Sequence, residues 1–375
     1  MSIAIVTESK SAEMREVKVG IIGCGGIANG KHMPSLHRLP NVKIVAFCDL
    51  IIERAEKAKA DFGTEDAFVC TDYRDLLKIE DIEVVHVLTP NIFHAEISIA
   101  ALDAGKHVMC EKPMATTYAD ALKMCEASKR NNKFLTIGYQ TRSSINHQFL
   151  RKMVERGELG EIYYMRAPNF RRRGVPLWGV FMDKEKQGGG PLIDIGTHSI
   201  DAILNLANNY DVVSVTGATY RKLADTAYNS NEWGIWKPEE YEVEDLAVGF
   251  VKFRNGAVLE LQAAWLINYV NDGGMAICGT KGGAQYCKEG LKLTGEMADG
   301  QLYETIVHPN STARDLFHGE TLTAEQYEAK QWIYSVVNNV PPVTTPEQAA
   351  VVSRVIEAVY KSAETGKTIY FDEEE

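Results

Sequence analysis

Six short apolar runs follow one another between residues 17 and 138, and polar or amphipathic stretches separate them. The runs read VKVGII, VKIVAFC, AFVC, EVVHVL, KHVM and FLTIGY. Two of the segments between them, residues 49–63 and 92–106, have the length and pattern of helices. Continuous apolar strands that alternate with helices are typical of a parallel sheet buried on both faces. The pattern therefore predicts an α/β doubly wound domain over residues 17–138.

The hydrophobic pattern of the sequence changes after about residue 139. Apolar and polar residues alternate with period two in residues 244–253 and 256–265, and an Asn-Gly turn between them predicts a hairpin. We expect an α+β domain over 139–375 with a mostly antiparallel sheet, and we treat residues 1–16 as an N-terminal extension. Further strands are expected at 162–170, 211–220 and 274–287, and helices at 191–207, 323–338 and 346–363.

The charge balance narrows the class of partner. Lys and Arg number 40 and Asp and Glu 51, so the 375-residue chain carries a formal charge of -11. This disfavours nucleic acid and anionic membranes. Its apolar runs are far shorter than the roughly 20 residues of a spanning helix, and the N-terminal segment is too acidic and polar for a secretory signal. The seven scattered cysteines suit reduced thiols. We expect a cytoplasmic protein that acts on a small molecule.

A glycine-rich turn directly follows the first predicted strand. It contains G-x-G-x-x-A at Gly23, Gly25 and Ala28. In a first βα turn, these residues allow a tight bend, close approach to a pyrophosphate and close packing of helix on strand. The anionic phosphates would lie at the helix N-terminus. Gly26 and Ile27 lie in the same turn and are also expected to contact the cofactor.

Asp49 ends the second predicted strand, 21 residues after the motif. An acid there can accept both hydroxyls of an adenosine ribose, and it would repel a 2′-phosphate, so NAD is expected rather than NADP. The alternative is that the glycines form only a tight loop and Asp49 only caps the next helix. Arg54, one turn further on, makes the NAD preference a moderate one.

Polar residues follow the fourth, fifth and sixth predicted strands, at the edge where doubly wound sheets bind ligands. Lys112 ends a buried strand and precedes a proline that restricts its backbone, which favours an active-site role. The full set of expected cofactor contacts beyond the glycine turn and Asp49 is Thr89, Asn91, His94, Glu111, Lys112 and Gln140.

The segment GGGPLIDIGTHSID, residues 188–201, holds Asp194, His198 and Asp201 at spacings of four and three. On a helix these side chains would share one face. They could form a metal site, an acid–base pair or the capped start of an ordinary helix. Three ligands on one helix without a second cluster are weak evidence for metal, so none is expected. The preceding glycines are expected to let the chain approach cofactor and substrate closely.

The chain resembles the glucose-fructose oxidoreductase / inositol 2-dehydrogenase family. GIIGCGGIANGKHMPSL, FCD, TPNIFHAEISIAALDAGKHVMCEKPMA, GYQTR and GGGPLIDIGTHSID carry the resemblance, in order, from residue 17 toward the C-terminus. It implies a Rossmann domain followed by an open-faced antiparallel sheet domain, NAD(P) as cofactor, and sugar or cyclitol substrates. It also implies a cis bond before Pro113, and a homodimer or homotetramer formed through the open face of the second sheet.

The resemblance assigns catalytic roles to Lys112, Asp194 and His198. We expect His198 to act as the base, since its ordinary pKa lies near neutrality. Asp194 would orient it, and Lys112 would polarise the reacting oxygen. Asp201 is expected to be structural. The family's substrate side further suggests Arg171 and Trp178 of the loop 169–190, and Tyr139 beside Gln140.

The expected function is an NAD-dependent dehydrogenase that oxidises a ring hydroxyl of a sugar, glycoside or cyclitol, or reduces the ketone. The family's range suggests the C3 hydroxyl. One alternative keeps NAD and uses transient oxidation for redox-neutral glycoside cleavage. The other is an NAD-binding regulator without catalysis, which the presence of Lys112, Asp194 and His198 disfavours.

Overall fold

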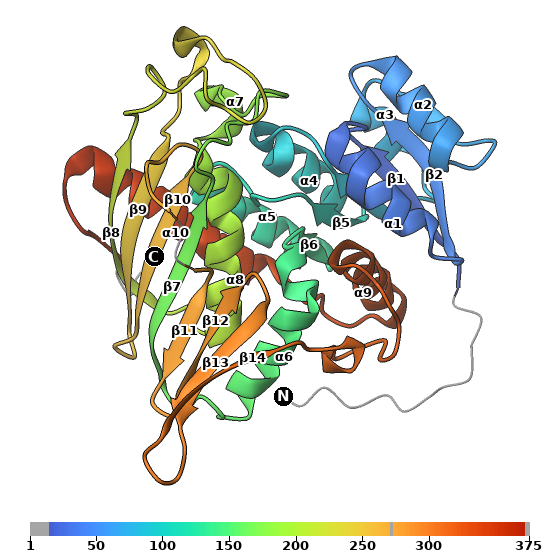
Figure 1. Cartoon of the computed structure of the whole chain (residues 1–375). Helices are drawn as coiled ribbons and strands as arrows, with labels where there is room; N and C mark the ends of the chain where they lie inside the picture. The colour runs from blue at the N-terminus through green and yellow to red at the C-terminus, as the bar shows by residue number, and fades with distance from the viewer. Residues whose placement is uncertain (1–14, 271–272, 372–375) are drawn as a thin grey trace.

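A parallel sheet of six strands forms the N-terminal half of the protein (Figure 1). The computed structural model describes residues 15–270 and 273–371, so most of the N-terminal extension lies outside the described residues. The strand order β3-β2-β1-β4-β5-β6 confirms the doubly wound prediction. The strands are β1 (Val17–Ile22), β2 (Val42–Cys48), β3 (Phe68–Cys70), β4 (Val84–Val87), β5 (His107–Cys110) and β6 (Leu135–Ile137).

Helices cover both faces of this sheet. One face packs against α1 (Met33–His37) and α2 (Ile52–Phe62), and the other against α3 (Tyr73–Leu77), α4 (His94–Asp103) and α5 (Tyr118–Asn131). The helices α2 and α4 lie in the two segments that the sequence predicts. Because both faces are buried, the strands are apolar almost throughout, which is why they are easy to recognise in the sequence.

A nine-stranded, mostly antiparallel sheet forms the second half, in the order β14-β13-β12-β11-β7-β10-β9-β8-β15. Only β7 and β10 pair in parallel, and the β9–β10 hairpin is confirmed. The expected strand at 274–287 is two strands joined at Thr280 and Lys281. The strands are β7 (Ile162–Phe170), β8 (Val212–Tyr220), β9 (Leu246–Phe253), β10 (Val258–Ala264), β11 (Ala276–Gly279), β12 (Gly282–Cys287), β13 (Gly290–Glu296), β14 (Leu302–Val307) and β15 (Ile369–Tyr370).

The helices of this half lie on one face of the large sheet, and its other face carries none in Figure 1. They are α6 (Ile145–Glu155), α8 (Thr197–Ala207) and α10 (Pro346–Thr365), with the short α7 (Lys184–Gln187) in the loop above them. None of the described helices is both long and apolar enough to cross a membrane.

The helix α9 (Ala324–Asn338) belongs to the second half by sequence but packs on the first. Its Trp332, Ile333 and Val336 share a buried core with strand β1 and helix α1. The expected segment 323–338 is therefore a helix, but it returns to the Rossmann core. A single boundary near residue 138 does not separate the two cores.

A buried ion pair ties the end of the parallel sheet to α8 and α10. Arg142 follows β6, and its Nε and Nη2 donate to Asp201 of α8 at 2.9 and 2.6 Å. Its Nη1 donates to Gln348 of α10 at 2.6 Å and to the Val343 carbonyl at 3.1 Å. Both members of the pair are buried. Asp201 is thus structural, as the sequence analysis expects.

Replacing Asp201 by Ala should strongly destabilise the protein, because it leaves the Arg142 guanidinium buried without its counter-charge. We expect the free energy of unfolding to fall by about 3–5 kcal/mol in urea titration followed by circular dichroism. The control is Asp103→Ala, which breaks an exposed pair with Arg130 and should cost less than about 1 kcal/mol. Equal losses in the two variants would contradict the assignment.

Candidate active site

The glycine turn after β1 has the shape that a dinucleotide phosphate needs. Gly23 has φ +93°, and a Cβ there would lie 2.5 Å from the Leu88 carbonyl oxygen, so only glycine fits. A Cβ at Gly25 or Gly26 would meet no atom within 4 Å. This open side of the turn is where a pyrophosphate can approach the backbone. The next residues fit the same arrangement, since Ile27 is partly exposed and Ala28 is buried against the sheet.

Asp49 lies beside this turn at the end of β2. Its Oδ2 accepts a hydrogen bond from the Cys24 amide at 2.9 Å, and its Oδ1 accepts one from the Ile51 amide at 2.9 Å. The carboxylate therefore fastens the glycine turn and also holds the start of α2. Each oxygen has a further lone pair for a ribose hydroxyl, so the capping and cofactor interpretations of Asp49 are compatible.

Two orphaned polar atoms mark the same edge of the sheet. The hydroxyl of Thr89 after β4 and the amide oxygen of Gln140 after β6 are buried and have no hydrogen-bond partner among the described residues. Buried polar groups are normally paired, so such atoms fit a site that binds a polar ligand. Asn91 has a partner: its Nδ2 donates to the Gln187 carbonyl at 2.9 Å and joins the two halves here.

Two residues that the sequence analysis expects to contact the cofactor, His94 and Glu111, have side chains that contact other parts of the protein. The ring nitrogens of His94 face the carbonyl oxygens of Pro113 and Thr89 at 2.7 and 2.8 Å, and the residue is buried. His94 therefore holds together the loops that follow β4 and β5. The bond between Lys112 and Pro113 is cis, as the resemblance implies.

Glu111 likewise has both carboxylate oxygens engaged inside the protein. Oε1 contacts Lys31 Nζ at 2.8 Å and His32 Nε2 at 2.9 Å, and Oε2 accepts from the Lys112 amide at 3.0 Å. Burial opposes its ionisation, but the Lys31 charge and the bond from His32 hold the pKa of Glu111 well below its usual range. Glu111 thus positions the backbone of Lys112. Lys31 and His32 lie 80 residues away, so no local pattern predicts their part in this.

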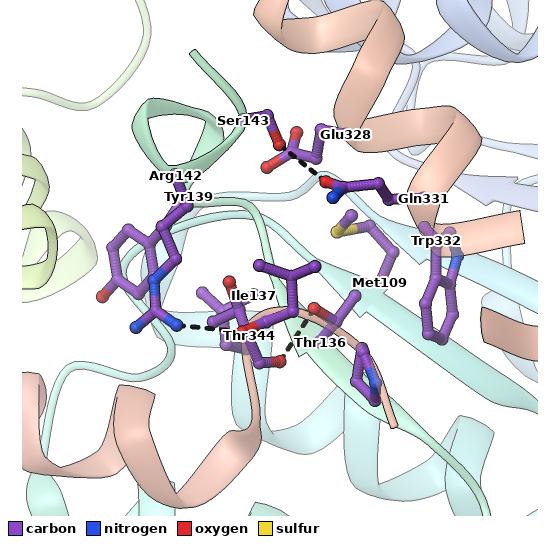
Figure 2. A pocket seen from close by; sticks show the side chains of 12 residues that line it. Met109, Thr136, Ile137, Tyr139, Arg142, Ser143, Glu328, Gln331, Trp332 and Thr344 are labelled. Carbon is purple, nitrogen blue, oxygen red and sulfur yellow. Dashed lines mark hydrogen bonds between the residues drawn. The ribbon is translucent and has the colours of Figure 1, made fainter. Parts of the chain in front are cut away.

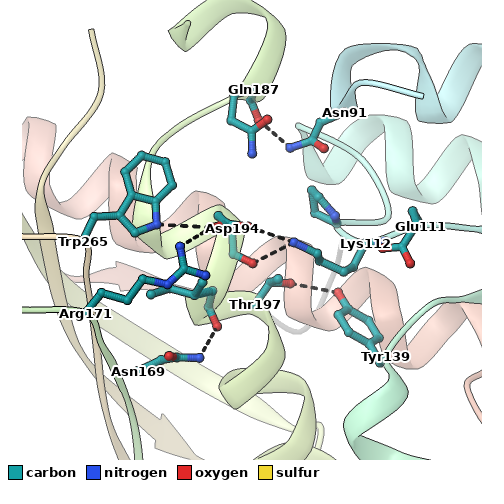
Figure 3. A network of polar contacts seen from close by, with 12 residues as sticks. Asn91, Glu111, Lys112, Tyr139, Asn169, Arg171, Gln187, Asp194, Thr197 and Trp265 are labelled. Carbon is teal, nitrogen blue, oxygen red and sulfur yellow. Dashed lines mark hydrogen bonds and ion pairs between the residues drawn. The ribbon is translucent and has the colours of Figure 1, made fainter. Parts of the chain in front are cut away.

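Lys112 and Asp194 form the centre of the site (Figure 3). Lys112 Nζ donates to Asp194 Oδ1 at 2.9 Å and to its backbone carbonyl at 3.0 Å. The other carboxylate oxygen, Oδ2, accepts from Trp265 Nε1 at 3.2 Å and lies 3.7 Å from Arg171 Nη1. Lys112 reaches Asp194 from the Rossmann side, and Trp265 and Arg171 reach it from the side of the large sheet. Both halves of the protein therefore contribute to the centre.

His198 lies next to this pair, but the expected orienting bond from Asp194 is not formed. Both Asp194 oxygens are used as described, and the buried Nδ1 of His198 has no hydrogen-bond partner among the described residues. The carboxylate, on the π-helical turn Leu192–Gly196 that precedes α8, is directed to Lys112, Trp265 and Arg171 instead. Burial and the Lys112 charge lower the pKa of His198 to about 3.

The three glycines before this turn serve a purpose that the sequence analysis does not foresee. A Cβ on Gly189 would lie 2.1 Å from the Tyr360 hydroxyl, and one on Gly190 would lie 2.4 Å from the Glu244 carbonyl oxygen. The Glu244 carboxylate accepts from the amides of Gly190 and Leu192 at 2.9 and 3.1 Å and from Tyr360 at 2.9 Å. The glycines thus let the π-turn pack closely against Glu244 and Tyr360.

The substrate-side residues divide into two groups. Tyr139 is buried, donates to or accepts from Thr197 Oγ1 at 3.0 Å, and supports α8 from behind. Arg171 and Trp178 instead lie toward solvent, and Trp178 is 54% exposed. Trp265, which bonds Asp194 from the end of β10, ends the alternating segment 256–265, but that pattern does not mark it as a site residue.

A small internal cavity lies apart from Lys112 and Asp194, under the residues that follow β6 (Figure 2). Its volume of about 20 Å³ has room for a single water. Thr136, Arg142, Glu328 and Trp332 are among its lining residues. Burial raises the pKa of Glu328 to about 7, although Lys31 at 3.0 Å opposes the shift. A cavity of this size cannot hold a sugar or a nicotinamide, so it is separate from the substrate site.

The fold and the glycine turn define an NAD-binding oxidoreductase. Residues 17–139 match the family model described as "Oxidoreductase family, NAD-binding Rossmann fold", and residues 147–285 match the GFO/IDH/MocA C-terminal domain. The chain belongs to this GFO/IDH/MocA family, as the resemblance indicates.

The similarity to one curated relative extends over nearly the whole chain. D-glucoside 3-dehydrogenase of Escherichia coli K12 is 34% identical over 355 residues, which cover 94% of this chain and 97% of the relative. Inositol 2-dehydrogenase of Salmonella typhimurium LT2 is 34% identical over 161 residues, covering 43% and 48%. A levoglucosan dehydrogenase solved with NADH and levoglucosan superposes with a TM-score of 0.80 at 23% identity, over 95% of this chain and 99% of that one.

Asp49→Asn should weaken the preference for NADH over NADPH. The amide removes the charge that repels a 2′-phosphate and one acceptor for the ribose, so the ratio of the two dissociation constants should shift by about tenfold. Fluorescence titration with each cofactor measures it. Asp61→Asn, an exposed acid on α2 that pairs with Lys57, is the matched control. An unchanged ratio in Asp49→Asn would rule out contact with the ribose.

Proposed function

We propose that this protein is an NAD-dependent dehydrogenase that oxidises a ring hydroxyl of a glycoside or related sugar to the ketone, or catalyses the reverse reduction. The single observation that carries the proposal is the bond from Lys112 Nζ to Asp194 at the carboxyl edge of the Rossmann sheet. Oxidation at C3 is proposed because the E. coli relative that spans nearly the whole chain is a D-glucoside 3-dehydrogenase.

The reaction needs two things from the protein beyond substrate binding. Oxidising a secondary alcohol breaks the C–H bond with its electron pair and removes the hydroxyl proton. NAD, when bound, supplies the hydride acceptor. In the proposal, His198 takes the hydroxyl proton. Its lowered pKa keeps the imidazole neutral and able to accept at physiological pH, while the same shift weakens it as a base, so the developing charge must be stabilised by other groups. Lys112 donates a hydrogen bond to the oxygen as negative charge develops on it.

Asp194 acts in this proposal mainly on Lys112. Its carboxylate and its carbonyl both accept from the ammonium group, which fixes the direction of the lysine. The same negative charge favours a proton on His198 once the alcohol has given it up. Asp194 is therefore proposed to hold the donor and to stabilise the protonated base, without a direct bond to the imidazole.

The expected homodimer or homotetramer is also part of the proposal. Phe250 and Ile306 are large apolar side chains that alternate with core-facing positions on the second sheet, and both are more than a third exposed. Such residues on a sheet face without helices support pairing of copies through that face.

Lys112→Met should lower kcat/KM for a methyl glucoside by about 10²–10⁴, since it removes the donor to the reacting oxygen. NADH absorbance measures the rate, over a panel of glycosides, sugars and inositols. Lys123→Met, an exposed lysine on α5 paired with Asp120, is the control and should stay within about twofold of wild type. Wild-type turnover by Lys112→Met would overturn the role, and product without NADH would instead identify the redox-neutral cleavage.

The pH dependence should reflect the environment of His198. Because a lowered pKa keeps the base unprotonated to lower pH, the acidic limb of the kcat/KM profile should lie well below 6.5. Initial rates from pH 4.5 to 8 at constant ionic strength measure it, and enzyme returned from each pH to 7.5 checks that it remains folded. A reversible half-loss near pH 6.5 would contradict the assignment.

A further inference from the structure

A chain of aromatic rings runs outward from the catalytic carboxylate. Trp265 donates to Asp194 Oδ2 at 3.2 Å, and its ring lies edge to face with Phe181 at 6.2 Å between centroids. Phe181 meets Trp178 at 6.1 Å, and Trp178 meets Trp233 at 5.1 Å, both again edge to face. The four rings come from three separate parts of the sequence, so the fold assembles them.

Arg171 contacts both the outermost ring of this chain and the same carboxylate. Its guanidinium lies 5.2 Å from the centroid of the Trp233 ring, and its Nη1 lies 3.7 Å from Asp194 Oδ2. Trp233, which the sequence analysis does not single out, is therefore only one side chain removed from the catalytic centre. The inner and outer ends of the aromatic chain are both fixed relative to Asp194.

Exposure increases along the chain from the inner ring to the outer ones. Trp265 is completely buried, whereas Trp233 is 39% and Trp178 is 54% exposed. The loop that carries Trp233 also contains Trp236, which is 3% exposed and donates from Nε1 to the Ala224 carbonyl at 2.9 Å. Trp236 anchors the loop, and Trp233 is presented at the surface. Large exposed aromatic pairs next to a reactive centre are typical of recognition sites.

The two loops that carry the exposed rings are bonded to each other. Asn231 Oδ1 accepts from the Val175 amide at 2.8 Å, and Asn231 Nδ2 donates to the Val175 carbonyl at 3.1 Å. Arg173 Nε donates to Ser230 Oγ at 3.0 Å. These bonds fix the spacing of Trp178 and Trp233 before any ligand arrives. A preformed aromatic surface loses little conformational entropy on binding.

We infer that Trp178 and Trp233 form a second subsite, which binds a six-membered ring joined by a glycosidic bond to the sugar that is oxidised. The inference rests on the proposed function and specifies its substrate class. The C–H groups on a pyranose face and the edges of an aryl ring carry partial positive charge, which suits the negative face of an indole. The reacting ring occupies the space beside Lys112 and Asp194, and the linked ring lies over the outer tryptophans.

The test compares three glucosides that differ only in what is attached to the sugar. Methyl glucoside has no second ring, phenyl glucoside has an aryl ring, and a glucosyl-glucose disaccharide has a sugar ring. We expect wild-type kcat/KM to be about tenfold higher for a ring-bearing substrate than for methyl glucoside. The two ring-bearing arms decide between an aryl and a sugar ring. Trp233→Leu should bring the ratio of ring-bearing to methyl substrate close to one.

Two further variants separate stacking from bulk effects. Trp233→Phe keeps an aromatic face and should retain part of the ratio. Ile235→Ala removes an exposed apolar side chain from the same loop and should leave the ratio as in wild type. A ratio near one in wild type, or one that Trp233→Leu leaves unchanged, overturns the subsite while the dehydrogenase assignment stands. If Trp233→Leu changes the oligomeric mass and not the ratio, the rings contact a second copy and the subsite is again overturned.

A readout without turnover keeps the subsite independent of the proposed reaction. If none of the glucosides is oxidised, the dehydrogenase proposal fails, and calorimetric titration of each into the NADH-loaded protein decides the subsite. Tighter binding of a ring-bearing glucoside than of methyl glucoside, lost in Trp233→Leu, upholds it. Equal affinities overturn it.

Discussion

The contact between Lys112 and Asp194 is the interaction that joins the two halves of the protein at the candidate site. A largely buried ion pair stabilises a structure only if the remaining donors and acceptors of both partners are satisfied. Here the Lys112 ammonium also bonds the Asp194 carbonyl, and Trp265 satisfies the second carboxylate oxygen. Since Lys112 belongs to the Rossmann sheet and Asp194 to the helix above it, the pair also aligns the cofactor side with the substrate side.

Two further buried carboxylates hold the backbone on either side of this pair. Glu111 accepts from the Lys112 amide, and Glu244 accepts from the amides of Gly190 and Leu192 just before Asp194. Each carboxylate is also bound by groups distant in sequence. These are Lys31 and His32 for Glu111, and the Tyr360 hydroxyl for Glu244. The side chains proposed to be catalytic are therefore directed by buried networks, which is how precise geometry is usually maintained.

The sequence predicts those parts of the protein in which short-range patterning and burial agree. The six apolar strands, the glycine turn and Asp49 follow from rules that act within about 30 residues, and the structure has them where expected. The sequence analysis does not predict β14, which is largely exposed and lacks an apolar alternation, nor β13, whose alternation is limited to Leu291 and Leu293. The place of α9 depends on tertiary packing that no local pattern encodes.

The candidate site likewise contains some residues that sequence patterns predict and others that they do not. The motifs are enough to propose Lys112 and Asp194, but the spacing of Asp194 and His198 does not reveal that the carboxylate binds Lys112 and Trp265 rather than the imidazole. His94 and Glu111 have the residue types of cofactor contacts, yet their partners are internal. Trp265 and Trp233 carry no recognisable motif, because their importance comes only from where the large sheet and its loops bring them.

The two oxygens of the Asp194 carboxylate contact different groups, so substitutions around one oxygen can leave the contacts of the other intact. Oδ1 accepts from Lys112, the proposed donor to the reacting oxygen, while Oδ2 faces Trp265 and Arg171, from which the aromatic chain extends to the surface. Side chains beyond Arg171 can therefore vary without disturbing the bond to Lys112, provided that Oδ2 keeps its donor from Trp265. In the proposed function, reactivity depends on residues at rigid strand ends and recognition depends on loops, which tolerate substitution better. The inner ring, Trp265, bonds Asp194 and also packs against the aromatic chain, so it constrains both the carboxylate and the loops.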